Sequence, residues 1–166
     1  KEKLEMNLIY DVAHNLARRE SFFHNGKFSD MIVHRKGATR ALPPGDLNLS
    51  EEFQEKGQPV IIPGDMGTCS YILKGIKNSP EKSFYSVCHG AGRKLSRKQA
   101  TKQLNKEKIL SYLASKDIKL LAASKKSILE EAPLAYKNIN RVIDVIKGAG
   151  LAGTVARLRP FGVIKG

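Results

Sequence analysis

The chain has 166 residues, and its apolar fraction of 41% and charged fraction of 27% are typical of one folded globular domain. Its net charge of +13 and pI near 9.8 favour a polyanionic partner, with nucleic acid as the first choice. No stretch of about 20 apolar residues resembles a membrane span, and residues 1–12 lack the continuous apolar run of a secretory signal, so we expect a cytoplasmic protein without a membrane partner.

The first apolar residues, from Leu4 to Val12, alternate with a period of two, which favours a strand that runs into residues 11–15, although Leu4, Leu8 and Ile9 would also fit a helix. Because the chain begins with Lys1 and enters this apolar segment at once, we expect a trimmed amino terminus or a larger parent protein. A second strand is predicted at Met31–His34 and is followed by a loop over 35–40.

The middle of the chain predicts loops that alternate with short buried strands. Residues 43–58 carry adjacent prolines, two glycines and scattered carboxylates, which favours a surface loop. Val60–Ile62 predicts a buried strand that ends in a turn at Pro63 and Gly64, and Phe84–Val87 predicts another strand that leads into Cys88 and His89.

The second half of the chain is mainly helical in its pattern. A lysine-rich helix is predicted from a cap at Ser96 to about Ser115, and a second helix covers 139–146 and stops at Gly148. A glycine turn and a last strand at Thr154–Leu158 follow. Strands first and helices mainly later predict an α+β fold with an irregular mixed sheet, rather than a wound parallel sheet.

Basic residues are concentrated between Arg93 and Lys126. This segment contains eleven lysines and arginines but only two acidic residues, Glu107 and Asp117. This density is typical of a surface that binds nucleic acid. A solvated lysine-rich helical surface, of the kind common on thermostable proteins, explains it equally well.

His89 follows an apolar strand and precedes Gly90, Ala91, Gly92 and Arg93. Glycines let the backbone approach a phosphate, Arg93 can neutralise charge, and a neutral imidazole can attack phosphorus. The alternative is a glycine turn in which His89 merely packs.

The two cysteines predict no site of their own. Because Cys88 and His89 are adjacent on a strand, their side chains point to opposite sides, which argues against a cysteine–histidine dyad. Two cysteines are also too few for a disulfide framework.

Two further segments carry polar residues near expected strand ends. Residues 63–70 could cradle a nucleotide, although they lack the ending of a P-loop, and a structural turn is the default explanation. Asp11, His14 and Asn15 could contribute to a manganese or zinc site, but one histidine cannot hold a metal alone.

The order and the residue sequences of these motifs resemble those of the RtcB family of RNA ligases, from about residue 7 to the end of the chain. The matching segments are 11–15 (DVAHN), 33–41 (VHRKGATRA), 62–68 (IPGDMGT), 89–93 (HGAGR), 132–137 (APLAYK) and 165–166 (KG). The resemblance implies an enzyme that uses GTP and Mn²⁺ to join RNA 2′,3′-cyclic phosphate or 3′-phosphate ends to 5′-hydroxyl ends, in tRNA splicing and RNA repair.

The resemblance also implies roles for single residues. His89 becomes guanylylated, and His14 is a metal ligand. The residues expected to contact the nucleotide are Asn15, Pro63, Gly64, Asp65, Met66, Ser70, Gly90, Ala91, Gly92, Tyr136 and Lys165. The candidates for RNA phosphate contacts are Arg35, Lys36, Arg93 and Arg97.

The chain is much shorter than full-length members of this family, whose remaining metal ligands lie in an amino-terminal part absent here. We therefore expect residues 1–166 to form the C-terminal catalytic portion, with that missing part, RNA such as tRNA halves, and archease as partners. A non-catalytic basic RNA-binding module is the main alternative, and a phosphohydrolase is a second enzyme class. Substitution of His89 by alanine separates the three hypotheses.

Overall fold

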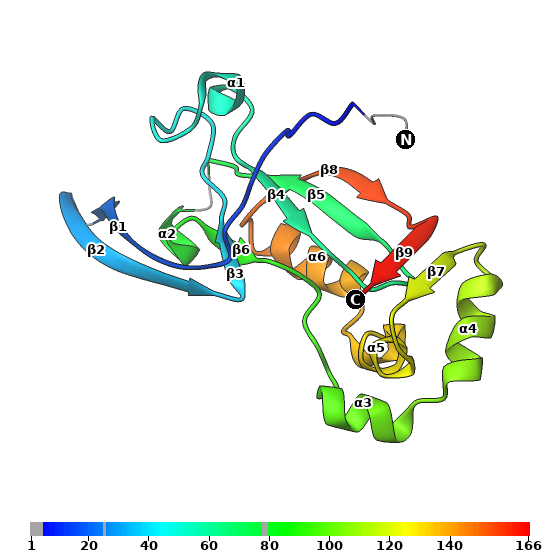
Figure 1. The fold of residues 1–166 in the computed structure, drawn as a ribbon. Helices are drawn as coiled ribbons and strands as arrows, with labels where there is room; N and C mark the ends of the chain where they lie inside the picture. The colour runs from blue at the N-terminus through cyan, green and yellow to red at the C-terminus, as the bar shows by residue number, and fades with distance from the viewer. Residues whose placement is uncertain (1–4, 25, 78–79) are drawn as a thin grey trace.

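The computed structural model describes residues 5–24, 26–77 and 80–166. It is an α+β fold of small sheets and short helices, which confirms the predicted class (Figure 1). The strands are β1 (Asn15–His24), β2 (Lys27–Lys36), β3 (Ala38–Arg40), β4 (Pro59–Ile62), β5 (Ser70–Lys74), β6 (Ser86–Cys88), β7 (Lys119–Ala122), β8 (Gly153–Leu158) and β9 (Gly162–Lys165). The helices are α1 (Glu51–Gln54), α2 (Pro80–Ser83), α3 (Arg97–Gln103), α4 (Lys106–Ala114), α5 (Lys125–Glu130), the 3-10 turn η1 (Pro133–Ala135) and α6 (Ile139–Gly148).

The main hydrophobic cluster lies between a three-stranded antiparallel sheet and one helix. The sheet has the order β4-β5-β8, and α6 lies against it in Figure 1. Ile62 and Leu73 from the sheet and Ile139, Ile143 and Ile146 from α6 are almost fully buried. The three-and-four spacing of the α6 isoleucines therefore places one apolar face of the helix on the sheet.

A second hydrophobic cluster joins the lysine-rich helices to the carboxyl terminus. Leu113 of α4 and Ile128 of α5 are buried there, with Val163 of β9 packed against them. Strands β7 and β9 form a parallel pair on the same side of the molecule. Met66, from the loop after β4, is buried in this cluster, so that loop connects the two cores.

Strands β1 and β2 form a ten-residue antiparallel ribbon that extends away from the sheets in Figure 1. Phe22 packs on Phe84 and Tyr85, but Phe23 and Phe28 remain 63% and 77% exposed. The predicted strand at Met31–His34 lies within β2.

The strand predicted from Leu4 into residues 11–15 is wrong over its described part. Leu4 lies outside the described residues, and 5–13 have no regular structure. Met6 and Leu8 are 85% and 84% exposed, so these alternating apolar residues do not pair with any sheet among the described residues. The first strand begins instead at Asn15.

Two predicted loops contain regular structure. Residues 35–40 are strand on both sides of Gly37, whose φ of 74° makes the turn between β2 and β3. The segment 43–58 contains α1, and buried Leu49 and Phe53 anchor it. Its prolines and glycines mark local turns, but they do not prevent packing by the apolar residues between them.

The strand predicted at Phe84–Val87 begins later, at Ser86. Phe84 and Tyr85 have φ values of 51° and 52°, outside the strand region. Strand β4, by contrast, matches the prediction at Val60–Ile62, and β8 matches the prediction at Thr154–Leu158 with Gly153 added.

The lysine-rich helix is interrupted. Ser96 forms the expected cap, with a full capping box to Gln99, but Leu104 is extended and Asn105 caps a new helix by accepting from the Lys108 amide. The predicted helix that ends at Gly148 is confirmed as α6, which Asn138 caps. No helix among the described residues is long and apolar enough to cross a membrane.

Candidate nucleotide pocket and histidine pair

Seven residues expected to contact a nucleotide line one open pocket of about 230 Å³. These residues are Pro63, Gly64, Asp65, Met66, Ser70, Tyr136 and Lys165. They come from the β4–β5 loop, from the residue after η1 and from β9, which are far apart in sequence. The pocket lies beside the loop that connects the first hydrophobic cluster, which contains Ile62, to the second, which contains Met66.

Hydrogen bonds within the β4–β5 loop hold its shape. The Asp65 carboxylate accepts from the Gly67 amide and from the Thr68 hydroxyl, each at 2.8 Å, and Ser70 Oγ accepts from the Gly64 amide at 3.3 Å. A Cβ on Gly64 would lie 1.9 Å from the Cys69 carbonyl oxygen. Glycine is therefore required at position 64 by the close approach of the backbone.

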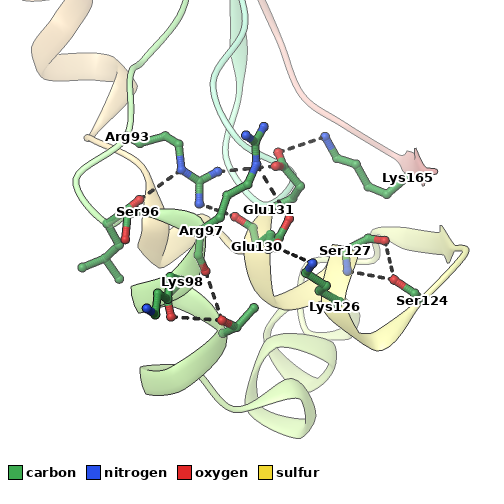
Figure 2. A network of polar contacts seen from close by, with 12 residues as sticks. Arg93, Ser96, Arg97, Lys98, Ser124, Lys126, Ser127, Glu130, Glu131 and Lys165 are labelled. Carbon is green, nitrogen blue, oxygen red and sulfur yellow. Dashed lines mark hydrogen bonds and ion pairs between the residues drawn. The ribbon is translucent and has the colours of Figure 1, made fainter.

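Glu131 is a pocket residue that the sequence analysis missed. Its carboxylate accepts a hydrogen bond from the Tyr136 hydroxyl. Its oxygens also lie 3.6 Å from Lys165 Nζ and 3.4 Å from Arg93 Nη1 (Figure 2). The local signal was a pair of carboxylates, Glu130 and Glu131, shortly after the basic segment that ends at Lys126. That signal does not show which segments the pair will face.

The network sets the ionisation of its members. Burial alone would raise the pKa of Glu131, but the Tyr136 hydroxyl and the charges of Lys165 and Arg93 outweigh burial and lower it. Burial and the bond to the carboxylate raise the pKa of Tyr136. Glu131 is thus held as an anion that fixes a tyrosine and a lysine at the pocket wall.

His89 and His14 form a second part of the site. Their rings are stacked, with centroids 4.4 Å apart and an angle of 7° between the planes. Gly37 joins the two segments, because its amide donates to the His14 carbonyl at 3.2 Å and its carbonyl accepts from the His89 amide at 3.3 Å. Residues 75 positions apart are therefore brought together by the turn between β2 and β3.

The environment of His89 favours its neutral form. Burial, followed by the charge of the stacked His14, lowers the pKa of His89. A neutral imidazole keeps a nitrogen lone pair available for attack or for metal binding. His14 itself is exposed and directly precedes β1. Asn15, the first residue of β1, is also exposed and lies opposite Lys36 of β2 in the strand register.

The glycine loop after His89 borders the pocket but does not line it. The Ala91 amide donates to the Pro63 carbonyl at 2.9 Å, and the Gly92 carbonyl accepts from the Lys137 amide at 2.9 Å. Gly90, Ala91 and Gly92 therefore connect the histidine segment to the two pocket segments. Asn15 also lies outside the lining.

The four arginines and lysines expected at RNA phosphates differ in accessibility. Arg35 is only 2% exposed, forms two bonds to Glu20 at 2.6 and 2.7 Å, and also donates to Ser86 Oγ and to the Phe84 carbonyl. Its guanidinium ties the β1–β2 ribbon to the segment before β6. This burial argues against the expected RNA contact at Arg35.

Arg93 is also occupied by protein groups. It donates to the carbonyls of Leu95 and Glu130 and to the Tyr136 hydroxyl. Lys36 and Arg97 are exposed, and Arg97 lies 3.7 Å from Glu130. Of the four expected phosphate contacts, only Lys36 and Arg97 have the accessibility that such a role needs.

The histidine pair does not provide a complete metal site. Among the described residues, no three histidine, cysteine, aspartate or glutamate side chains gather closely enough to hold a metal ion. Cys69 is buried near Asn140 and Cys88 is half-buried, and both are free thiols. Within this part of the chain His14 can supply one imidazole ligand.

Comparison with known proteins identifies close relatives over nearly the whole chain. Residues 1–166 match the family model described as tRNA-splicing ligase RtcB. The chain is 50% identical over 165 residues to the tRNA-splicing ligase RtcB of Pyrococcus abyssi, covering 99% of this chain and 18% of that protein. It is 48% identical to the Thermococcus kodakarensis ligase of that name, covering 99% of this chain and 34% of the relative. It thus spans between 18% and 34% of the length of these two relatives.

Proposed function

This chain belongs to the RtcB family of tRNA-splicing ligases, and we propose that it forms the C-terminal, guanylate-accepting portion of an RNA ligase. The observation that carries this proposal is the convergence of seven expected nucleotide contacts on one pocket. The proposed reaction joins RNA 2′,3′-cyclic phosphate or 3′-phosphate ends to 5′-hydroxyl ends with GTP.

The first proposed step is attack by a neutral His89 ring nitrogen on the α-phosphorus of GTP. A phosphorus–nitrogen bond forms, the bond to the β-phosphate oxygen breaks, and pyrophosphate leaves. The lowered pKa of His89 favours the neutral form that this attack needs. His14, stacked on the ring, and Gly37, bonded to both segments, orient the nucleophile.

In the later steps the guanylate moves from His89 to the RNA 3′-phosphate, which breaks the phosphorus–nitrogen bond. The 5′-hydroxyl then attacks the 3′-phosphate phosphorus, and GMP departs as a phosphodiester forms. Tyr136 and Lys165 would hold the guanine portion of the nucleotide, with Glu131 fixing both side chains. Of the four residues expected at RNA phosphates, Lys36 and Arg97 are exposed and available for such contacts.

Manganese fits this scheme only in part. His14 suits it as one nitrogen ligand, and further ligands would come from outside this chain. When bound, manganese would offset the negative charge that builds up at the reacting phosphate. The same proposal names tRNA halves, the amino-terminal part of the ligase and archease as partners.

The test is labelling of the protein by α-³²P GTP with manganese, with and without an added amino-terminal part of the family. Acid-labile label should appear on the protein and be lost in His89→Ala. His34→Ala is the matched control, because His34 is an exposed histidine of β2 outside the pocket. Label that survives in His89→Ala, or that never forms with the added part, would contradict the proposal.

A further inference from the structure

A second hollow, of about 430 Å³, is lined in part by the β4–β5 loop, which also lines the candidate nucleotide pocket. Three cationic side chains line it: Lys116 from the turn after α4, Arg157 from β8, and Arg159 just after β8. No carboxylate stands among the described residues that line it. Two segments far apart in sequence, the turn after α4 and the end of β8, thus contribute positive charge to one concave surface.

Parts of this hollow are held in place by neighbouring groups. Lys116 Nζ donates to the Gly67 carbonyl at 3.0 Å and lies 4.5 Å from the centroid of the Tyr112 ring. Asn140, also in the lining, accepts from the Tyr71 hydroxyl at 2.8 Å. A ligand would therefore meet one lysine whose position is already restricted, so less side-chain entropy is lost on binding.

The hollow is directly connected to the candidate site. Pro160 lines both the hollow and the nucleotide pocket. Gly67 and Thr68 line the hollow, and they belong to the same loop as Gly64 and Asp65, which line the pocket. An anion in the hollow would thus lie against the same loop that lines the candidate nucleotide pocket.

We propose that this hollow binds a backbone phosphate of an RNA strand, beside the nucleotide pocket and outside it. The charge of the lining selects an anion, and arginine matches phosphate with paired donors. The choice of RNA rests on the proposed function and agrees with the net charge of +13. The exposed guanidinium groups of Arg157 and Arg159 are open to a long polymer, which needs no enclosed cavity.

The experiment measures binding of a fluorescent single-stranded oligoribonucleotide to the intact protein across a range of salt concentrations. In Arg157→Gln/Arg159→Gln, affinity should fall by roughly tenfold near physiological salt. The slope of log affinity against log salt should become shallower by about 0.7, the value for one phosphate contact on a single strand. Arg157→Lys/Arg159→Lys should recover most of that slope because it keeps the charges.

The matched control is Lys56→Gln/Lys147→Gln, which removes the same charge from exposed positions after α1 and in α6. It should alter RNA affinity by less than twofold. Equal losses in the two double variants would overturn the proposal, because they would mean that only total charge matters.

Two further measurements separate the rival explanations. Guanylate labelling in Arg157→Gln/Arg159→Gln should equal that of the unmodified protein. If the unmodified protein binds RNA as expected but never takes label, the proposed ligase function fails and the RNA site stands. If calorimetry shows that pyrophosphate binding is lost in the variant while RNA affinity is unchanged, the hollow is a site for a free anion and the RNA proposal is wrong.

Discussion

The nucleotide pocket and the β1–β2 ribbon contribute to the same candidate site but are packed very differently. The candidate pocket takes its lining in part from the second hydrophobic cluster and from the loop between the two clusters, and its residues Glu131, Tyr136 and Lys165 form one network with Arg93. The ribbon, with His14 directly before it, is a two-stranded element in which Phe22 is buried but Phe23 and Phe28 are exposed.

This difference in packing separates the part of the site that the chain can hold by itself from the part that needs support. Side chains fixed by several bonds and by a core on either side keep their geometry without a ligand. A two-stranded ribbon in water is only marginally stable. We therefore expect nucleotide binding to depend on residues of this chain, and metal binding to depend also on contacts outside it.

The largest expected effect is at the loop that joins the two cores. Gly64→Ala places a Cβ against the Cys69 carbonyl oxygen, so the loop must move, and the unfolding free energy should fall by about 3 kcal/mol. Nucleotide affinity should fall by more than tenfold. Denaturant unfolding and titration with a fluorescent GTP analogue measure the two effects.

Gly148→Ala is the control for this substitution. Gly148 ends α6 with open space around its Cβ position, so alanine should leave stability within about 0.5 kcal/mol of the unmodified chain. Similar losses at the two glycines would show that the close approach at Gly64 does not shape the pocket.

An intermediate effect is expected at Glu131. Glu131→Gln keeps the size of the side chain but removes its charge, which should lower stability by about 1–2 kcal/mol at neutral pH. Because the pKa of Glu131 is lowered in the folded state, its contribution is present above the unfolded pKa of about 4.3 and is lost as pH falls through the folded value.

The pH dependence makes this prediction specific. The difference in unfolding free energy between the unmodified chain and Glu131→Gln should be full at pH 6–7 and shrink as the solution becomes acidic, starting at about pH 4.3. Glu107→Gln, at an exposed position of α4, is the control, and its unfolding free energy should differ little from that of the unmodified chain at any pH. If the difference in unfolding free energy between the unmodified chain and Glu131→Gln stays constant below about pH 4, then the shape of the Glu131 side chain, and not its charge, is responsible for the loss of stability.

The smallest effect is expected on the ribbon. Phe28→Ser removes an exposed ring and should change the unfolding free energy of this chain by less than about 0.5 kcal/mol. In hydrogen exchange, amides of β1 and β2 should exchange faster than those of β5, which has strands on both sides. Equal protection of β1 and β5 would contradict the division between a rigid pocket and a weakly supported ribbon.

The parts of the fold that could be predicted are those with short-range signals. The cap at Ser96, the periodic isoleucines of α6 and the apolar run of β4 each depend on residues within a few positions, and each was found. The break at Leu104 was missed because helix-forming residues continue on both sides of it, although Asn105 is a favoured capping residue. The later start of β6 was missed because Phe84 and Tyr85 are strand-forming residue types whose positive φ values depend on the folded context.

By itself the sequence predicted seven of the residues that line the candidate nucleotide pocket, through segments that resemble the RtcB family, whereas the expected contacts Asn15, Gly90, Ala91 and Gly92 lie outside its lining. Only the tertiary structure decided that His14 stacks on His89, that Glu131 enters the pocket, and that Arg35 is buried against Glu20. These contacts depend on strand register and on packing between segments distant in sequence. Residue types and local spacing do not specify such pairings, since the same side chains could face solvent if the strands paired differently.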